Sequence, residues 1–181
     1  MEVIPTKIPG VLLIRPRVFT DERGAFAETY QRARYAAAGM GAEFVQDNFS
    51  RSRQGTLRGL HYQVEQPQGK LIWVVRGEIF DAVVDLRRSS PTFGQSVAVT
   101  LSSETFEQLF VPPGLAHGFY AQSDVAEVSY KCTAPYAPAH ERTLLWNDAA
   151  LGIAWPSSSP LLSEKDRRGL SFVEAPKYET M

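Results

Sequence analysis

The chain has 181 residues, of which 44% are hydrophobic and 22% charged, and this composition predicts one globular domain spanning residues 1–181. Its 19 basic and 20 acidic side chains give a formal net charge of −1, which predicts no general attraction to nucleic acid or to a membrane surface. A local basic pocket for a phosphate remains compatible with this balance.

The number of cysteines and the length of the apolar runs indicate the cellular compartment in which the protein is expected. Cys132 is the only cysteine, so no disulfide can form within the chain. The first ten residues lack the apolar core of a signal peptide, and no run approaches the roughly 20 apolar residues that a membrane helix needs. We therefore expect a cytoplasmic protein with no membrane span.

The hydrophobic pattern has a period of two over much of the chain, which predicts a mainly β fold. About nine short segments rich in Val, Ile, Phe and Tyr, separated by turn signals such as Pro112-Pro113-Gly114, read as a sandwich, jelly roll or barrel. The expected strands are Val11–Val18, Leu57–Gln63, Lys70–Arg76, Ile79–Leu86, Ser96–Leu101, Phe106–Val111, His117–Ala121, Val125–Tyr130 and Thr143–Trp146.

Two segments have helical signals. Gln31–Ala38 is rich in alanine and ends at Gly39, a plausible C-terminal cap, while Ser163 is a candidate N-cap for a short turn through Asp166. The polar runs Asp21–Glu28 and Gln46–Ser50 favour solvated loops, although the first includes a turn followed by a possible strand. We expect the tail after Phe172 to lie on the surface or on a partner subunit.

His61 and His117 have the spacing of the two sequence motifs of cupin barrels. In metal-binding cupins a second histidine stands two positions after the first, whereas this chain has Gln63 there, and the acidic position falls near Gln68. Two imidazoles are too few for an ordinary transition-metal site, which argues for a barrel without a metal. Taken alone, His61 is as compatible with a core or rim position as with a functional one.

Burying several cationic side chains without an anionic partner costs free energy. The cationic side chains in this part of the chain are Arg58, His61 and Lys70. In an ideal strand Arg58 and His61 point to opposite faces because they are three residues apart. A bulge at Gly59 could turn one of them toward the other's face. We therefore expect these cations to face a barrel interior that receives an anion.

Ten stretches share their residues and their order with one known family, and they are Phe19–Glu28, Gln46–Asn48, Leu57–Gln63, Gly69–Leu71, Asp85–Gly94, Pro112–Phe119, Tyr130–Thr133, Trp146–Asp148, Ile153–Pro156 and Leu162–Asp166. From about residue 5 to residue 170 the chain therefore resembles this family, the dTDP-4-dehydrorhamnose 3,5-epimerases. One departure is visible, because the segment from His61 to Lys70 is one residue shorter than the family pattern.

The resemblance implies a cupin-type jelly-roll barrel with a few short helices that epimerises C3 and C5 of dTDP-4-dehydro-6-deoxyglucose, without a cofactor, for dTDP-rhamnose biosynthesis. The C4 ketone acidifies the hydrogens on both carbons, so a base can remove them. By the resemblance His61 is this base, Asp166 orients it, Lys70 stabilises the enolate and Tyr130 is the acid. Without the resemblance, core packing would be the simpler interpretation of Tyr130.

The resemblance also implies substrate-binding positions and a homodimer, in which the N-terminal stretch of one subunit contributes to the site of the other. Tyr136 is the candidate for stacking on the thymine ring, and the arginines suit a diphosphate. The implied binding residues are Arg23, Phe26, Glu28, Gln46, Asn48, Arg58, His117, Tyr136, Glu141 and Lys165.

Three alternatives stay open from the sequence. An epimerase that acts at C3 or C5 alone, on another dTDP-4-keto-deoxysugar in natural-product glycosylation, would share these motifs. A non-catalytic sugar-nucleotide-binding barrel would keep the arginines but would need neither His61 nor Asp166. A metal-dependent cupin oxygenase would contain stoichiometric iron or manganese.

Overall fold

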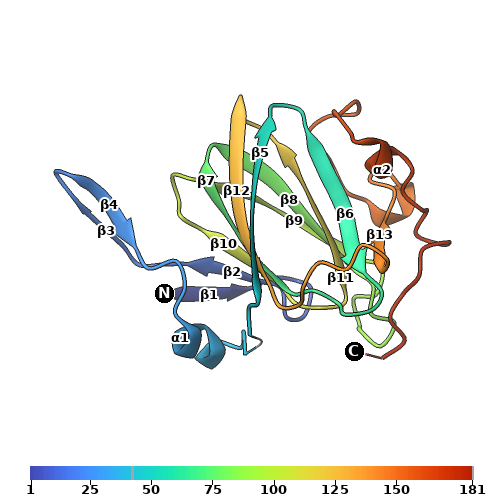
Figure 1. Ribbon diagram of the computed structural model, residues 1–181, viewed down its shortest axis with the longest axis horizontal. Coiled ribbons are helices and arrows are strands. Elements are labelled where there is room, and N and C mark those ends of the chain that lie inside the picture. The colour runs from blue at the N-terminus through green and yellow to red at the C-terminus, as the bar shows by residue number, and fades with distance from the viewer. Residues whose placement is uncertain (42, 181) are drawn as a thin grey trace.

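The computed structural model describes residues 1–41 and 43–180, and most of the chain forms two antiparallel sheets that face each other (Figure 1). One sheet has six strands in the order β1 (Glu2–Pro5), β2 (Leu12–Arg15), β10 (Gln108–Val111), β7 (Lys70–Arg76), β12 (Val125–Cys132) and β5 (Gln46–Arg53). The other has five, in the order β13 (Glu141–Thr143), β6 (Leu57–Gln63), β11 (Leu115–Ala121), β8 (Glu78–Asp85) and β9 (Ser96–Ser102).

The expected jelly-roll barrel is confirmed by this pair of sheets, and its interior is apolar toward one end. Alternate residues of both sheets meet there, as the two-residue period of a strand requires. Ile72 and Val128 of the six-stranded sheet and Val83 and Leu101 of the five-stranded sheet are fully buried in this cluster. Toward the other end the inward positions are polar, and the interior opens into a pocket.

Two further apolar clusters lie outside the barrel. Helix α1 (Arg32–Ala37) covers the outer face of the six-stranded sheet through Tyr35, which packs with Ile14 and Leu71. The C-terminal segment covers the outer face of the five-stranded sheet, where Tyr178 packs against Tyr62. The expected surface position of the tail is therefore wrong for its apolar residues, because the outward face of β6 and β8 is hydrophobic and must be covered.

Several predicted elements differ in detail from those observed. The strand expected over Val11–Val18 is broken at Pro16 into β2 and β3 (Val18–Asp21), because proline cannot donate a hydrogen bond to the ladder. Strand β3 pairs with β4 (Gly24–Ala27) in a hairpin that projects away from the barrel (Figure 1). The last strand begins earlier than expected, at Glu141, and strand β1 had not been predicted.

The polar run Gln46–Ser50, interpreted as a loop, is the start of strand β5, which pairs with β12 along its whole length. Its inward positions are polar because they line the pocket, so the usual apolar alternation is missing. The two predicted helical segments are confirmed as α1, which Gln31 caps, and as α2 (Glu164–Arg167), which Ser163 caps. None of the helices in the described ranges is long and apolar enough to cross a membrane.

Candidate functional site

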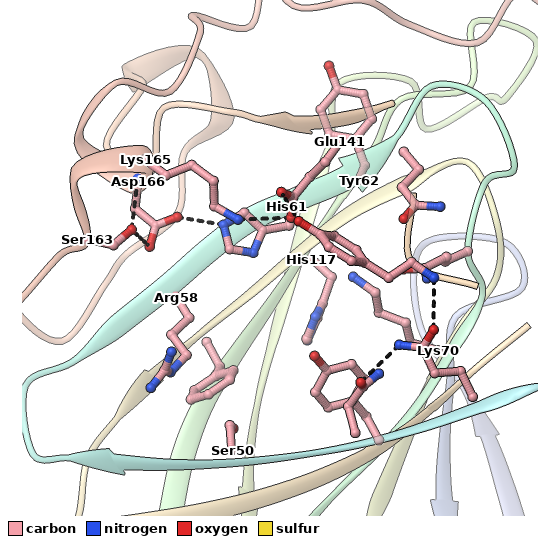
Figure 2. A pocket seen from close by; sticks show the side chains of 17 residues that line it. Ser50, Arg58, His61, Tyr62, Lys70, His117, Glu141, Ser163, Lys165 and Asp166 are labelled. Atoms are coloured by element: carbon pink, nitrogen blue, oxygen red, sulfur yellow. Dashed lines mark hydrogen bonds and ion pairs between the residues drawn. The ribbon is translucent and has the colours of Figure 1, made fainter. Parts of the chain in front are cut away.

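A pocket of about 600 Å³ opens between the two sheets at the polar end of the barrel (Figure 2). This volume falls within the usual range for small-molecule sites. Side chains reach it from strands of both sheets and from α2, so residues from across the chain meet in one cavity. The predicted residues that line it are Gln46, Asn48, Arg58, His61, Lys70, His117, Tyr130, Tyr136, Glu141, Lys165 and Asp166.

His61 and Asp166 form a short hydrogen-bonded pair, with Nε2 of the imidazole 2.5 Å from Oδ1 of the carboxylate. The Ser163 hydroxyl donates to Oδ2 of Asp166 at 2.7 Å and accepts a hydrogen bond from the Asp166 amide. Ser163 is thus both the N-cap of α2 and the group that fixes the orientation of the carboxylate. The other ring nitrogen of His61 remains available to the cavity.

Burial and pairing shift the two pKa values of this pair. Burial would raise the pKa of the Asp166 carboxyl, but hydrogen bonds from His61 and Ser163 lower it below its usual value. Burial lowers the pKa of the His61 imidazole, and the Asp166 carboxylate opposes that shift. At neutral pH the pair therefore holds an ionised carboxylate against a neutral imidazole that can accept a proton.

The predicted bulge at Gly59 is confirmed, and it directs both Arg58 and His61 into the pocket. The register between β6 and β11 shifts between the pairs His117↔His61 and Phe119↔Arg58, so two residues of β6 lie opposite one of β11. Gly59 has a φ of +123°, and a Cβ there would lie 2.5 Å from the Cα of Gly118. The strand therefore needs glycine at this point.

Lys70 and Tyr130 lie on the neighbouring strands β7 and β12, on the six-stranded side of the pocket. Burial lowers the pKa of the Lys70 ammonium, although nearby Cys132, Asp81 and Glu141 oppose the shift. Burial raises the pKa of the Tyr130 phenol, so the hydroxyl keeps its proton at neutral pH. The pocket thus places an amine and a phenol across from the imidazole of His61.

His117 is paired with a residue that the sequence analysis did not identify. Its Nε2 lies 2.8 and 3.0 Å from the two carboxylate oxygens of Asp81, which is fully buried on β8. Because a carboxylate accepts, Nε2 carries the hydrogen, and the other ring nitrogen has no hydrogen-bond partner among the described residues. The alternation of β8 could have suggested Asp81, since it stands between the apolar inward positions Ile79 and Val83.

At the pocket mouth Glu141 links two other predicted residues. Lys165 Nζ donates to one carboxylate oxygen at 2.9 Å, and the Tyr136 hydroxyl donates to the other at 3.0 Å. Burial would raise the pKa of Glu141, but the hydrogen bond from Lys165 and the nearby His61 lower it. The backbone N–H of Tyr136 in turn donates to Oε1 of Gln46, so this loop is attached to β5.

Gln63, at the position where metal-binding cupins have a second histidine, has a structural role. Its amide nitrogen donates to the carbonyls of Gln66 and Pro135, and its oxygen accepts from the Ala137 amide. These bonds hold together the two loops that border the pocket. Within the described ranges no group of three or more His, Cys, Asp or Glu residues is arranged to hold a metal ion.

Three predicted binding residues lie away from the pocket of their own chain. Arg23 is at the tip of the β3–β4 hairpin, where its side chain is 86% exposed and pairs with Asp21. Phe26, on β4, is 70% exposed, and Glu28 pairs with Arg34 beside α1. The hairpin points away from the barrel (Figure 1), so a single chain does not bring these residues to His61.

The fold and the pocket define a class of protein, a cupin-like jelly-roll barrel whose polar interior can support acid–base chemistry on a small anionic molecule. The chain matches the model of the dTDP-4-dehydrorhamnose 3,5-epimerase family over residues 5–174. It is 54% identical over 177 residues to the dTDP-4-dehydrorhamnose 3,5-epimerase of Pseudomonas aeruginosa, with 97% of this chain and 98% of the relative covered.

Two solved structures are informative. The dTDP-6-deoxy-D-glucose-3,5-epimerase of Legionella pneumophila, solved with dTDP-4-keto-L-rhamnose, has a TM-score of 0.96 at 44% identity, over 99% of this chain and 98% of that one. A 3′-monoepimerase of Streptomyces bikiniensis, solved with dTDP-quinovose, has a TM-score of 0.87 at 35% identity, over 93% and 87% of the two chains. The chain belongs to the dTDP-4-dehydrorhamnose 3,5-epimerase family and is an isomerase acting on a sugar nucleotide.

Proposed function

We propose that this protein inverts C3 and C5 of dTDP-4-dehydro-6-deoxyglucose to give dTDP-4-dehydrorhamnose, in dTDP-rhamnose biosynthesis. The observation that carries the proposal is the His61–Asp166 pair, which faces Lys70 and Tyr130 in one polar cavity. A base and a proton donor in the same cavity are what inversion at a carbon next to a ketone requires.

In the proposed reaction His61 removes the proton from C3 or C5. The electron pair of that C–H bond forms a carbon–carbon double bond with C4, and the C4 oxygen becomes an enolate. Lys70 stabilises this oxygen by donating to it. Tyr130 then returns a proton to the opposite face of the carbon, and exchange with water restores the proton on Tyr130 and removes the one on His61.

The pKa shifts support these assignments. A lowered pKa keeps the His61 imidazole neutral, which is the form that accepts a proton. A raised pKa keeps the Tyr130 phenol protonated, which is the form that donates one. Asp166 stabilises the imidazolium once it forms and holds the ring in the tautomer whose free nitrogen faces the sugar.

For binding, we propose that Arg58 holds the diphosphate and that Tyr136 stacks on the thymine ring. The guanidinium can donate two parallel hydrogen bonds to phosphate, and the Tyr136 ring is 53% exposed at the pocket mouth. The remaining polar groups of the pocket contact the nucleotide or the sugar, and they are Gln46, Asn48, His117, Glu141 and Lys165.

We further propose a homodimer in which Arg23, Phe26 and Glu28 complete the pocket of the partner subunit. The exposure of Phe26 and the projection of the hairpin support this arrangement (Figure 1). A mixture of His61→Ala and Arg23→Ala chains tests it. If the hairpin crosses, one pocket of each mixed dimer has both residues and activity returns, whereas a hairpin acting on its own chain leaves the mixture inactive.

The proposed activity needs no metal or other cofactor, and we place it in the cytoplasm. Among the described residues no three His, Cys, Asp or Glu side chains are grouped to hold a metal ion, and two histidines alone make a poor metal-binding set. Elemental analysis of the purified protein tests this point. Iron or manganese at one equivalent per chain, with activity lost on chelation, would contradict a metal-free mechanism.

The main rival is an epimerase acting at one carbon, such as the Streptomyces bikiniensis 3′-monoepimerase, to which the chain is less similar than to the 3,5-epimerases. Incubation with dTDP-4-keto-6-deoxyglucose in deuterated water, followed by NMR, separates the two. Deuterium at both C3 and C5 supports the double epimerase, and deuterium at one carbon supports the rival. Absence of exchange with intact nucleotide binding would indicate a sugar-nucleotide-binding barrel.

A further inference from the structure

Ser50 has a buried hydroxyl in the pocket with no partner among the described residues. It lies on β5, where alternate side chains face the barrel interior (Figure 2). The neighbours on this face are engaged, because Gln46 Nε2 donates to Asn48, Asn48 Nδ2 contacts Cys132 and the Ser52 hydroxyl accepts from Arg58. Of these four residues on the inward face of β5, Ser50 is therefore the one whose side chain has no hydrogen-bond partner among the described residues.

A buried hydroxyl without a protein partner is an uncommon feature of a folded protein. Most buried polar atoms in folded proteins are paired, and a buried donor or acceptor without a partner destabilises the folded state. A serine hydroxyl left without a protein partner on the wall of a pocket of about 600 Å³ suggests that a bound molecule supplies the partner.

The surroundings of Ser50 indicate which part of that molecule it meets. Arg58 Nε donates to Ser52 at 2.9 Å, and its Nη2 donates to the backbone carbonyl of Arg51 at 3.3 Å. These contacts fix the guanidinium along β5, on the strand that carries Ser50, and leave Nη1 for a ligand. A fixed positive charge with a free hydroxyl on the same wall suits an anionic oxygen such as a phosphate oxygen.

We propose that Ser50 is a substrate-binding residue whose hydroxyl donates to a phosphate oxygen of the sugar nucleotide beside the Arg58 guanidinium. Ser52 is then a positioning residue that acts through Arg58. This assignment rests on the proposed function, since it takes the ligand to be a nucleoside diphosphate sugar. The Ser50 hydroxyl would thus be a further donor in the diphosphate subsite, for which the sequence analysis indicated arginine side chains.

Calorimetric titration of the Ser50→Ala variant with dTDP and with thymidine tests the assignment. Because a hydrogen bond to a charged group contributes about 1.5–3 kcal/mol, we expect dTDP to bind at least about tenfold more weakly. Thymidine has no phosphate, so its affinity should not change. Ser129→Ala is the matched control, because Ser129 lies on the adjacent strand β12 and its hydroxyl contacts only the Asn48 carbonyl at 3.4 Å.

Thermal unfolding of the ligand-free protein provides a second, independent measurement. Removing an unpaired buried hydroxyl should leave the Tm of Ser50→Ala unchanged or raise it, whereas a serine with a structural role would lower it. Wild-type affinity for dTDP in Ser50→Ala, or an equal loss for dTDP and thymidine, would overturn the assignment. A wild-type protein that bound no dTDP would instead refute the proposed function.

Discussion

Replacing Asp166 by asparagine tests how much of the rate depends on the charge behind His61. The substitution keeps the shape of the side chain but removes the negative charge that lies 2.5 Å from Nε2 of the imidazole. It also replaces a carboxylate oxygen, which can only accept a hydrogen bond, by an amide group that can donate one. The imidazole ring of His61 can then be held in the wrong tautomer. Arg58, the residue proposed to bind phosphate, is not altered.

The size of the effect follows from the geometry of the pair. Two unit charges about 4 Å apart interact by roughly 4 kcal/mol at an effective dielectric constant of about 20. Asp166 is 3% exposed, so water screens this interaction little. Losing it in the transition state, where the imidazole becomes charged, predicts a rate about 10³-fold lower, at about 1.4 kcal/mol per factor of ten.

The assay is the rate of deuterium incorporation at C3 and C5, measured with saturating substrate so that chemistry is separated from binding. We expect the rate to fall while the affinity for dTDP stays near wild type. Asp148→Asn is the matched control, because Asp148 also caps a helical turn but does not line the pocket. A loss of less than about tenfold in Asp166→Asn would refute the role assigned to this carboxylate.

Further substitutions test other parts of the site. His61→Ala should lose deuterium exchange by several orders of magnitude but retain dTDP binding, and near-normal turnover would remove it from the mechanism. Arg58→Ala should mainly raise the Kd for dTDP in calorimetry, since a charge-assisted donor is lost. Because burial lowers the His61 pKa, kcat/KM should stay high until the pH falls below about 6.5, and its acidic limb should move still lower in Asp166→Asn. Gly59→Ala should lower the Tm sharply in thermal unfolding, because its Cβ would meet the Gly118 backbone, and a wild-type Tm would contradict the bulge geometry.

Much of the architecture could be read from the sequence because strand alternation is a local property. Segments rich in apolar residues, such as Lys70–Arg76, were predicted with the bounds observed for β7. Strand β5 was missed for the same reason, since its inward residues line a polar pocket and give no apolar alternation. The hydrophobic pattern therefore did not predict β5, the strand that forms one wall of the site.

The sequence by itself determined the types of side chain available for acid–base chemistry and, through its motifs, the family. Only the tertiary structure decided how they meet, because His61 and Asp166 are 105 positions apart and no local pattern joins them. The pairing of Asp81 with His117 and the unpaired Ser50 hydroxyl likewise became visible only when strands remote in sequence closed around the cavity. A hydrogen bond depends on positions in space, and the pairing and register of the strands set those positions.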